Sequence, residues 1–257
     1  MKMPQWLSDA IICPQTGNPL HLQNESFIGA GGISYPVQNG IPNLVFPADL
    51  SGEDAKWNKF YNVFAPFYDF EERMVGKYML GISVPKARTE IVAHLHLKPG
   101  MNILEVSPGP GVYQPVLMQA ISPGGSLVAL DLSLPMLRQI QRKKMTENKY
   151  LFRGNASYLP FSANTFDALF HFGGLNLFTE PQRALQEFVR VVKPGGIVAY
   201  GDEAFSPSLP DGWKKRLAAK MNPGFLKPDL SPPQGIEQII RHEVYGGYAY
   251  LVVAIKK

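Results

Sequence analysis

The stretch Glu105-Val-Ser-Pro-Gly-Pro-Gly111 constrains the fold more than any other part of this sequence. An apolar run at 101–106 leads into it and a longer apolar segment at 112–121 follows it, a pattern that predicts a strand, a tight turn and a helix. In this order, the turn brings backbone N–H groups to a nucleotide-like ligand at the helix N-terminus. A second apolar run, 126–131, ends in Asp131, where a carboxylate can accept hydrogen bonds from ribose hydroxyls. The turn and the acid together indicate a site for a nucleoside-bearing cofactor.

Strand-like and helix-like segments continue to alternate along the rest of the chain. Strands are expected at 150–153, 166–172 and 197–200, and helices at 89–97 and 181–192. The last two apolar segments, 236–245 and 248–257, are joined by Gly246-Gly247, and such a two-residue link predicts an antiparallel hairpin.

The order of these motifs resembles that of the class I S-adenosylmethionine-dependent methyltransferases. The likeness is clear by Asp131 and covers roughly 55–257. The run Phe172-Gly-Gly-Leu-Asn-Leu-Phe-Thr-Glu180 is similar to the matching loop of the menaquinone and ubiquinone C-methyltransferases. The resemblance implies an α/β fold over 51–257, with a Rossmann-like, seven-stranded, mostly parallel sheet and an antiparallel C-terminal hairpin strand. It also implies S-adenosyl-L-methionine as the cofactor and transfer of its methyl group as the reaction.

The resemblance places the cofactor contacts at the ends of the predicted strands. It assigns to Glu105 the anchoring of the turn and the orientation of the methionine amino group, and it sets Asn155 against the adenine. The predicted cofactor-binding residues are Tyr61, Glu105, Ser107, Pro108, Gly109, Gly111, Asp131, Leu132, Asn155, Ala156 and His171. Ser107 departs from the family pattern, which usually has glycine there, but serine is small enough for cofactor binding to be expected.

Methyl transfer from a sulfonium requires mainly alignment of the acceptor and exclusion of water. A base is needed only if the acceptor must lose a proton. His171 is the predicted catalytic base, because it ends the strand at 166–172 and titrates in the right range. The alternative is a neutral histidine that packs near the cofactor. Asp202 and Glu203 are the second choice for the base.

The acceptor is expected to be small and largely apolar or aromatic. The Asp/Asn-Pro-Pro-aromatic signature of methyltransferases that act on base amines is absent, since His171-Phe-Gly-Gly174 stands in its place. Residues 204–235 form a long insertion that we interpret as a substrate lid, partly helical at 213–221. The predicted acceptor contacts are Tyr68, Asn176, Glu203, Phe205 and Trp213. The cations at 214–220 are interpreted as a solvated helix face, with contact to an anion as the alternative.

Residues 1–50 are short segments punctuated by proline and glycine, with a tight-turn signal at Asn39-Gly40. The Cys13-Pro pair and the Tyr-Pro…Asn-Gly-Ile-Pro ending resemble a small zinc-ribbon domain attached to a number of methyltransferases. That domain holds zinc with paired cysteines, and tetrahedral zinc takes about four ligands. Here Thr16 stands at the second cysteine position and Cys13 is the only cysteine. We therefore expect a small β appendage without metal.

Charge and hydropathy narrow the choice of partners. The net charge of +4, from 25 basic and 21 acidic residues, is too small to indicate nucleic acid, so we expect no DNA partner and do not favour RNA. An RNA methyltransferase stays open because of the zinc-ribbon-like segment, and a non-catalytic cofactor-binding protein stays open because of Ser107. No run approaches the roughly 18 apolar residues of a membrane span, and the first residues lack a signal-peptide core, so a cytoplasmic location is expected. The sequence does not indicate an oligomeric state.

Overall fold

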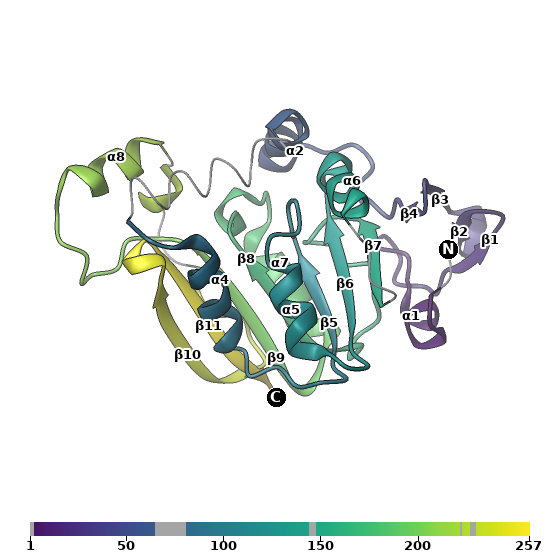
Figure 1. Ribbon diagram of the computed structural model, residues 1–257. Helices are drawn as coiled ribbons and strands as arrows, with labels where there is room; N and C mark the ends of the chain where they lie inside the picture. Colours follow the sequence, from purple (N-terminus) through teal and green to yellow (C-terminus); the bar gives the residue numbers. More distant parts are fainter. Residues whose placement is uncertain (1–2, 65–80, 144–147, 222, 227–229) are drawn as a thin grey trace.

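A seven-stranded sheet forms the centre of the molecule (Figure 1). The structure is a computed structural model and describes residues 3–64, 81–143, 148–221, 223–226 and 230–257. The strand order is β10-β11-β9-β8-β5-β6-β7; β9, β8, β5, β6 and β7 run parallel, and β11 is antiparallel to both β9 and β10. The strands are β5 (Asn102–Val106), β6 (Ser126–Asp131), β7 (Lys149–Arg153), β8 (Phe166–Phe172), β9 (Val192–Glu203), β10 (Ile236–Val244) and β11 (Ala249–Lys256). The predicted fold class is confirmed.

Helices cover both faces of this sheet, which explains why its central strands are continuous apolar runs. All six residues of β6 are buried, as expected for a parallel strand covered on both sides. Helices α4 (Val84–Ala93) and α5 (Gln114–Ile121) pack on one face, and α7 (Pro181–Val191) packs on the other. Helix α6 (Leu134–Arg142) covers β6 and β7 through Leu137 and Ile140.

Two predicted boundaries were wrong. The helix expected at 89–97 begins at Val84 and ends at Ala93. Strand β9 begins at Val192, before the Lys-Pro-Gly-Gly segment that was expected to separate helix and strand. The pairing of β8 with β9 shifts its register between Phe166 and Ala168, so the backbone at 193–196 bulges out of a ladder that resumes at Ile197.

The N-terminal appendage is a four-stranded antiparallel sheet beside β7. It consists of α1 (Gln5–Ala10), β1 (His21–Gln23), β2 (Ser26–Ile28), η1 (Ala30–Gly32), β3 (Ser34–Gln38) and β4 (Ile41–Pro42). Asn39 (φ 51°) and Gly40 (φ 79°) form the predicted tight turn between β3 and β4, where Gln38 pairs with Ile41. Leu7, Ile11 and Phe27 are fully buried in the same core as the large sheet.

Several segments lie beyond the C-terminal ends of the parallel strands (Figure 1). Helix α2 (Gly52–Phe64) crosses above this edge, and the loop after β8 contains η4 (Leu175–Leu177). Residues 204–235, the predicted substrate lid, contain α8 (Trp213–Met221), as predicted, and η5 (Pro223–Leu226). A short η6 (Tyr245–Gly247) joins β10 to β11. Across the described ranges, every helix is too short or too polar to span a bilayer.

Candidate functional site

The glycine turn after β5 leaves open space beside its backbone. Ser107, Gly109 and Gly111 all have positive φ, at 53°, 54° and 77°. A Cβ at Gly111 would lie 2.9 Å from Ile140 Cγ1, so packing requires glycine there. A Cβ at Gly109 would meet nothing within 4 Å, so a ligand can lie directly against this backbone. The Ser107 N–H donates to Leu130 O at 2.8 Å and ties the turn to β6.

Asp131 is bound directly to the turn. Its Oδ2 accepts from the Gly109 N–H at 3.1 Å and its Oδ1 from the Ser133 N–H at 2.8 Å. Burial raises the pKa of this carboxyl to about 6, while the backbone hydrogen bonds oppose that shift. Leu132, the next residue, is half-buried at the same strand end. The two features that indicated a cofactor in the sequence therefore meet in space.

Glu105 presents a buried carboxylate oxygen without a hydrogen-bond partner among the described residues. The side chain is 2% exposed, and its Oε2 accepts from Gln114 Nε2 at 3.0 Å, while Oε1 has no partner. Burial raises the pKa of Glu105 to about 7. A buried oxygen of this kind is stabilised by a cationic donor, and the ammonium group of S-adenosylmethionine is such a donor.

Helix α2 is fastened over this edge at both ends. Near its start, Asp54 accepts from Asn155 Nδ2 at 3.2 Å and from the Thr179 N–H at 2.9 Å. Near its end, Asn62 Oδ1 accepts from Ser133 Oγ at 2.7 Å. From the sequence, only Tyr61 of this helix was predicted to contribute to the site; its polar residues were missed, although they repeat at helical spacing.

Tyr61, a predicted cofactor contact, is half-buried on α2 and packs against Trp57 and Phe60, with ring centroids 6.0 and 5.4 Å away. Tyr68, a predicted acceptor contact, lies outside the described residues.

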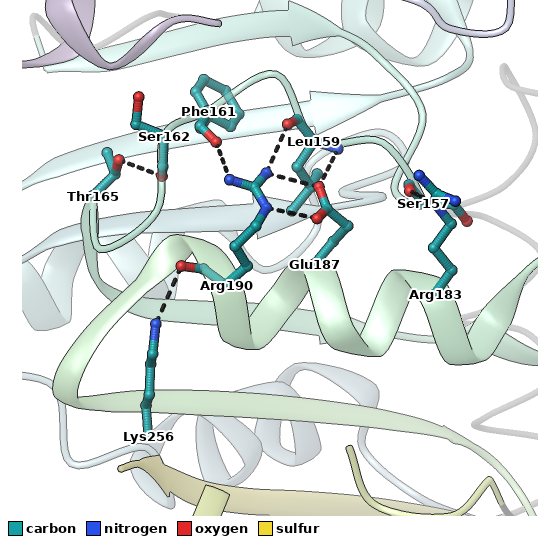
Figure 2. Close-up of polar contacts among 9 residues, drawn as sticks. All are labelled: Ser157, Leu159, Phe161, Ser162, Thr165, Arg183, Glu187, Arg190 and Lys256. Atoms are coloured by element: carbon teal, nitrogen blue, oxygen red, sulfur yellow. Dashed lines mark hydrogen bonds and ion pairs between the residues drawn. The ribbon is translucent and has the colours of Figure 1, made fainter. Parts of the chain in front are cut away.

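The loop after β7 holds Asn155 and Ala156, both buried at the same edge. Asn155 Oδ1 accepts from the Ser157 N–H at 2.9 Å, which fixes the local turn. The chain after this loop is bound to helix α7 (Figure 2). Arg190 of α7 donates to Phe161 O and Leu159 O at 2.7 and 3.0 Å. Glu187, paired with Arg190 at 2.6 Å, accepts from the Leu159 N–H and completes the network.

His171 is packed inside the core rather than presented to an acceptor. It is fully buried between the rings of Phe178 and Phe188, at centroid distances of 5.3 and 5.6 Å. Its Nδ1 lies 3.0 Å from Val106 O; a carbonyl only accepts, so Nδ1 carries the proton. Its Nε2 is buried, with no partner among the described residues, and burial lowers the pKa of the ring. Of the two interpretations of His171, this geometry favours the neutral, packed histidine over the base.

The two acids at the end of β9 have different surroundings. Asp202 is 3% exposed and accepts from the Gly174 and Asn176 N–H groups at 2.9 and 2.7 Å, so it shapes the loop after β8. Glu203 is partly buried, and burial together with the nearby Asp202 raises its pKa well above the usual range. This shift favours the protonated form of Glu203, which is a hydrogen-bond donor rather than a base.

The predicted lid residues separate into a half-buried, packed group and an exposed group. Phe205 stacks on Phe225 at 4.7 Å, and Tyr248 meets Phe205 edge-on at 6.1 Å, which gives an aromatic cluster at the start of the lid. Trp213 is 63% exposed and does not join this cluster.

Comparisons with known proteins agree with this arrangement. The family model described as "Methyltransferase domain" matches residues 104–200. The demethylmenaquinone methyltransferase of Listeria monocytogenes serotype 4a (strain HCC23) is 34% identical over 167 residues, which cover 63% of this chain and 68% of that relative.

Solved structures show the same fold. A SAM-dependent methyltransferase from Aquifex aeolicus aligns with a TM-score of 0.53 at 20% identity, over 80% of this chain and 100% of that chain. One chain of a Haloferax volcanii complex between the Trm112 methyltransferase activator and a methyltransferase aligns with a TM-score of 0.57 at 13% identity, over 76% and 97% of the two chains. Together with the matched domain and the Listeria relative, these likenesses show that the chain belongs to the class I S-adenosylmethionine-dependent methyltransferases.

Proposed function

We propose that this methyltransferase acts on a small, largely apolar or aromatic acceptor, with a demethylated quinone ring as the best guide to its chemistry. The observation that carries the proposal is the 34% identity, over 167 residues, to a protein named demethylmenaquinone methyltransferase. The aromatic cluster of Phe205, Phe225 and Tyr248 at the start of the lid supports it, because flat apolar rings pack well against such side chains.

In this proposal, four features of the site hold the cofactor. Glu105 Oε1 binds the ammonium group, Asp131 binds the ribose hydroxyls, and the open side of Gly109 accommodates the backbone-facing part of the ligand. Asn155 and Ala156 lie where the adenine would be held, under α2. Because α2 is fastened to Asn155 and Ser133, entry of the cofactor is expected to exchange some of these bonds for bonds to the ligand.

The chemistry then depends on alignment. Bound S-adenosylmethionine supplies an activated methyl group on a sulfonium, and the sulfur leaves as a neutral thioether. Residues of the chain orient the acceptor and exclude water. Glu203 lies beside Gly173, and in its protonated form, which the raised pKa favours, it can donate a hydrogen bond to an acceptor oxygen and hold the ring in line. Both carboxylate oxygens of Asp202 accept from backbone N–H groups, which preserves the shape of the loop after β8.

One experiment tests the acceptor class directly. The protein is incubated with cofactor labelled in its methyl group, first with a lipid extract and then with total RNA, and labelled products are identified by mass spectrometry. The proposal expects label in a ring-containing product of the lipid fraction. Label in RNA alone would contradict it and support an RNA methyltransferase. Binding of the cofactor in calorimetry without any labelled product would favour a non-catalytic role.

A further inference from the structure

Exposed apolar side chains occur on two elements that lie beyond the C-terminal ends of the parallel strands (Figure 1). On α2, Phe60 is 41% exposed and Val63 is 70% exposed. On the lid, Trp213, Leu217 and Leu226 are 63%, 37% and 70% exposed. Helices α2 and α8 both lie beyond the strand ends at this edge (Figure 1). Single exposed apolar residues are common, but several around one site mark an interaction surface.

Helix α8 presents a mixed stripe to solvent. Trp213, Arg216, Leu217 and Lys220 are all exposed and follow the spacing i, i+3, i+4, i+7, so they share one face of the helix. Ala218, on the opposite face, is 5% exposed and packs inward. A solvated helix face has no need of a tryptophan and a leucine among its cations. A helix lying in a lipid interface combines these residue types, because long cationic side chains reach the headgroups while aromatic and leucine side chains enter the acyl region.

The charge of this segment has one dominant sign. Between 211 and 220 the chain has four cations and one acid, Asp211. Asp211 pairs with Lys215 at 2.8 Å, and Lys215 also lies 5.4 Å from the ring centroid of Phe205, so Lys215 belongs to the lid's own packing. Arg216 and Lys220 stand on the exposed stripe with Trp213 and Leu217. A partner that complements this face has an anionic surface and an apolar interior directly below it.

We propose that the stripe of α8 (Trp213, Arg216, Leu217, Lys220) together with Leu226 docks the protein on an anionic lipid bilayer. We call these five residues the docking face. Phe60 and Val63 of α2 lie at the same edge, so the docked protein presents the edge that carries the cofactor site to the membrane. The inference extends the proposed function: an apolar acceptor dissolved in a bilayer reaches the site without crossing water.

Vesicle flotation tests docking without an acceptor. The full-length protein is mixed with vesicles of phosphatidylglycerol or of phosphatidylcholine that contain no quinone or other acceptor. Binding to the anionic vesicles is expected, with the double variant Arg216→Glu/Lys220→Glu weakened at least about tenfold and Leu217→Ser/Leu226→Ser also weakened. Because no acceptor is present, failure here concerns docking alone, while the labelling experiment decides the acceptor class.

Matched controls lie elsewhere on the same chain. Lys98→Glu/Lys257→Glu reverses two exposed cations at the opposite end of the sheet, and Ile239→Ser/Ile240→Ser removes two exposed apolar residues from β10. Both should bind vesicles like the unmodified protein. Cofactor binding in calorimetry confirms that each variant is folded.

Bromine-labelled phospholipids give a second measurement, because they quench tryptophan fluorescence only at short range. Quenching should be strong in Trp57→Phe, which removes the tryptophan of α2 and keeps Trp213, and largely lost when Trp213→Phe is added, which leaves Trp6. Equal binding to both vesicle types, no loss in the docking-face variants, or quenching that survives in the double variant would overturn the proposal. Tighter binding to RNA than to vesicles, lost in the same charge variant, would assign the face to nucleic acid instead.

Discussion

At the scale of single residues, the site uses conformations and ionisation states that a side chain adopts only under constraint. Ser107 has φ 53° where the family usually has glycine, and a left-handed backbone conformation costs an L-residue roughly 1–2 kcal/mol. Ser107→Gly should therefore increase the free energy of unfolding by about 0.5–1 kcal/mol, measured by urea denaturation. Ser107→Ala is the control, since alanine keeps the Cβ. An equal gain in both variants would show that the hydroxyl, not the backbone, is responsible.

The raised pKa of Glu105 predicts that the affinity for the cofactor depends on pH. Its pKa is raised to about 7 in the free protein, and only the ionised form pairs with an ammonium group. Affinity should therefore rise as pH increases through this value, by about tenfold between pH of about 6 and about 8. Calorimetry across this range measures the effect. Glu105→Gln should bind more weakly and lose most of the slope; a slope that persists in this variant would assign it to Asp131, whose pKa is about 6.

The raised pKa of Glu203 predicts an upper pH limit to activity. Because burial and Asp202 raise this pKa well above the usual range, Glu203 keeps a proton to donate at a higher pH than an ordinary carboxyl and loses it as the pH rises through the raised pKa. Glu203→Ala should lower kcat/KM roughly 3- to 10-fold, the effect of one neutral hydrogen bond. Glu203→Gln keeps a donor, so it should stay close to the unmodified protein and show no alkaline loss. Equal activity of all three proteins would remove Glu203 from the acceptor site.

At the scale of elements, the strands could be predicted from the sequence because both faces of the sheet are covered. Burial of every residue of β6 leaves a continuous apolar run, and the Gly-Gly link identifies the final hairpin. The start of β9 could not be predicted, because Lys-Pro-Gly-Gly is typical of a loop, while the ladder accommodates it as a bulge. For His171, the sequence left a base and a packed, neutral ring as alternatives, because the choice depends on Phe188 of α7 facing that side of β8.

Long-range polar contacts were the other part of the site that the sequence could not show. Asp54 and Asn155 are far apart in the chain, and only the path of α2 over the sheet edge brings them within hydrogen-bonding distance. Similarly, Asn62 meets the Ser133 cap of α6 only in the folded chain. By contrast, Asp131 and the glycine turn were predictable as neighbours, because adjacent parallel strands end at the same edge.

The network between α7 and the loop after β7 gives a prediction for stability. Arg190 is about one-third exposed and bonds Glu187 and two backbone carbonyls, each of which would lose a hydrogen bond in Arg190→Met (Figure 2). The variant should lose about 2–3 kcal/mol of unfolding free energy in urea denaturation. Lys86→Met, which breaks an exposed pair with Glu90, is the control and should change stability by less than about 0.5 kcal/mol. A loss in Arg190→Met as small as that expected for the control would show that the network adds little to stability.

At the scale of the whole molecule, the N-terminal appendage and the large sheet share one core. Leu7, Ile11 and Phe27 of the appendage are fully buried in the same cluster as Phe152 and Phe161. Backbone bonds cross the boundary as well, with the Leu44 N–H donating to Arg153 O at 2.8 Å. Arg153 ends β7, directly before the loop that contains Asn155, so the appendage supports the strand end from which that loop starts.

A shared core predicts that the chain unfolds as one cooperative unit. Ile11→Ala should lower the unfolding free energy by about 2–5 kcal/mol, because a cavity opens in the common core. Near-ultraviolet circular dichroism and loss of cofactor binding should then change at the same urea concentration. Leu22→Ala, at a position 38% exposed on β1, is the control and should leave the midpoint almost unchanged. An early transition in Ile11→Ala that spares cofactor binding would instead show that the appendage folds independently and that residues 51–257 are stable without it.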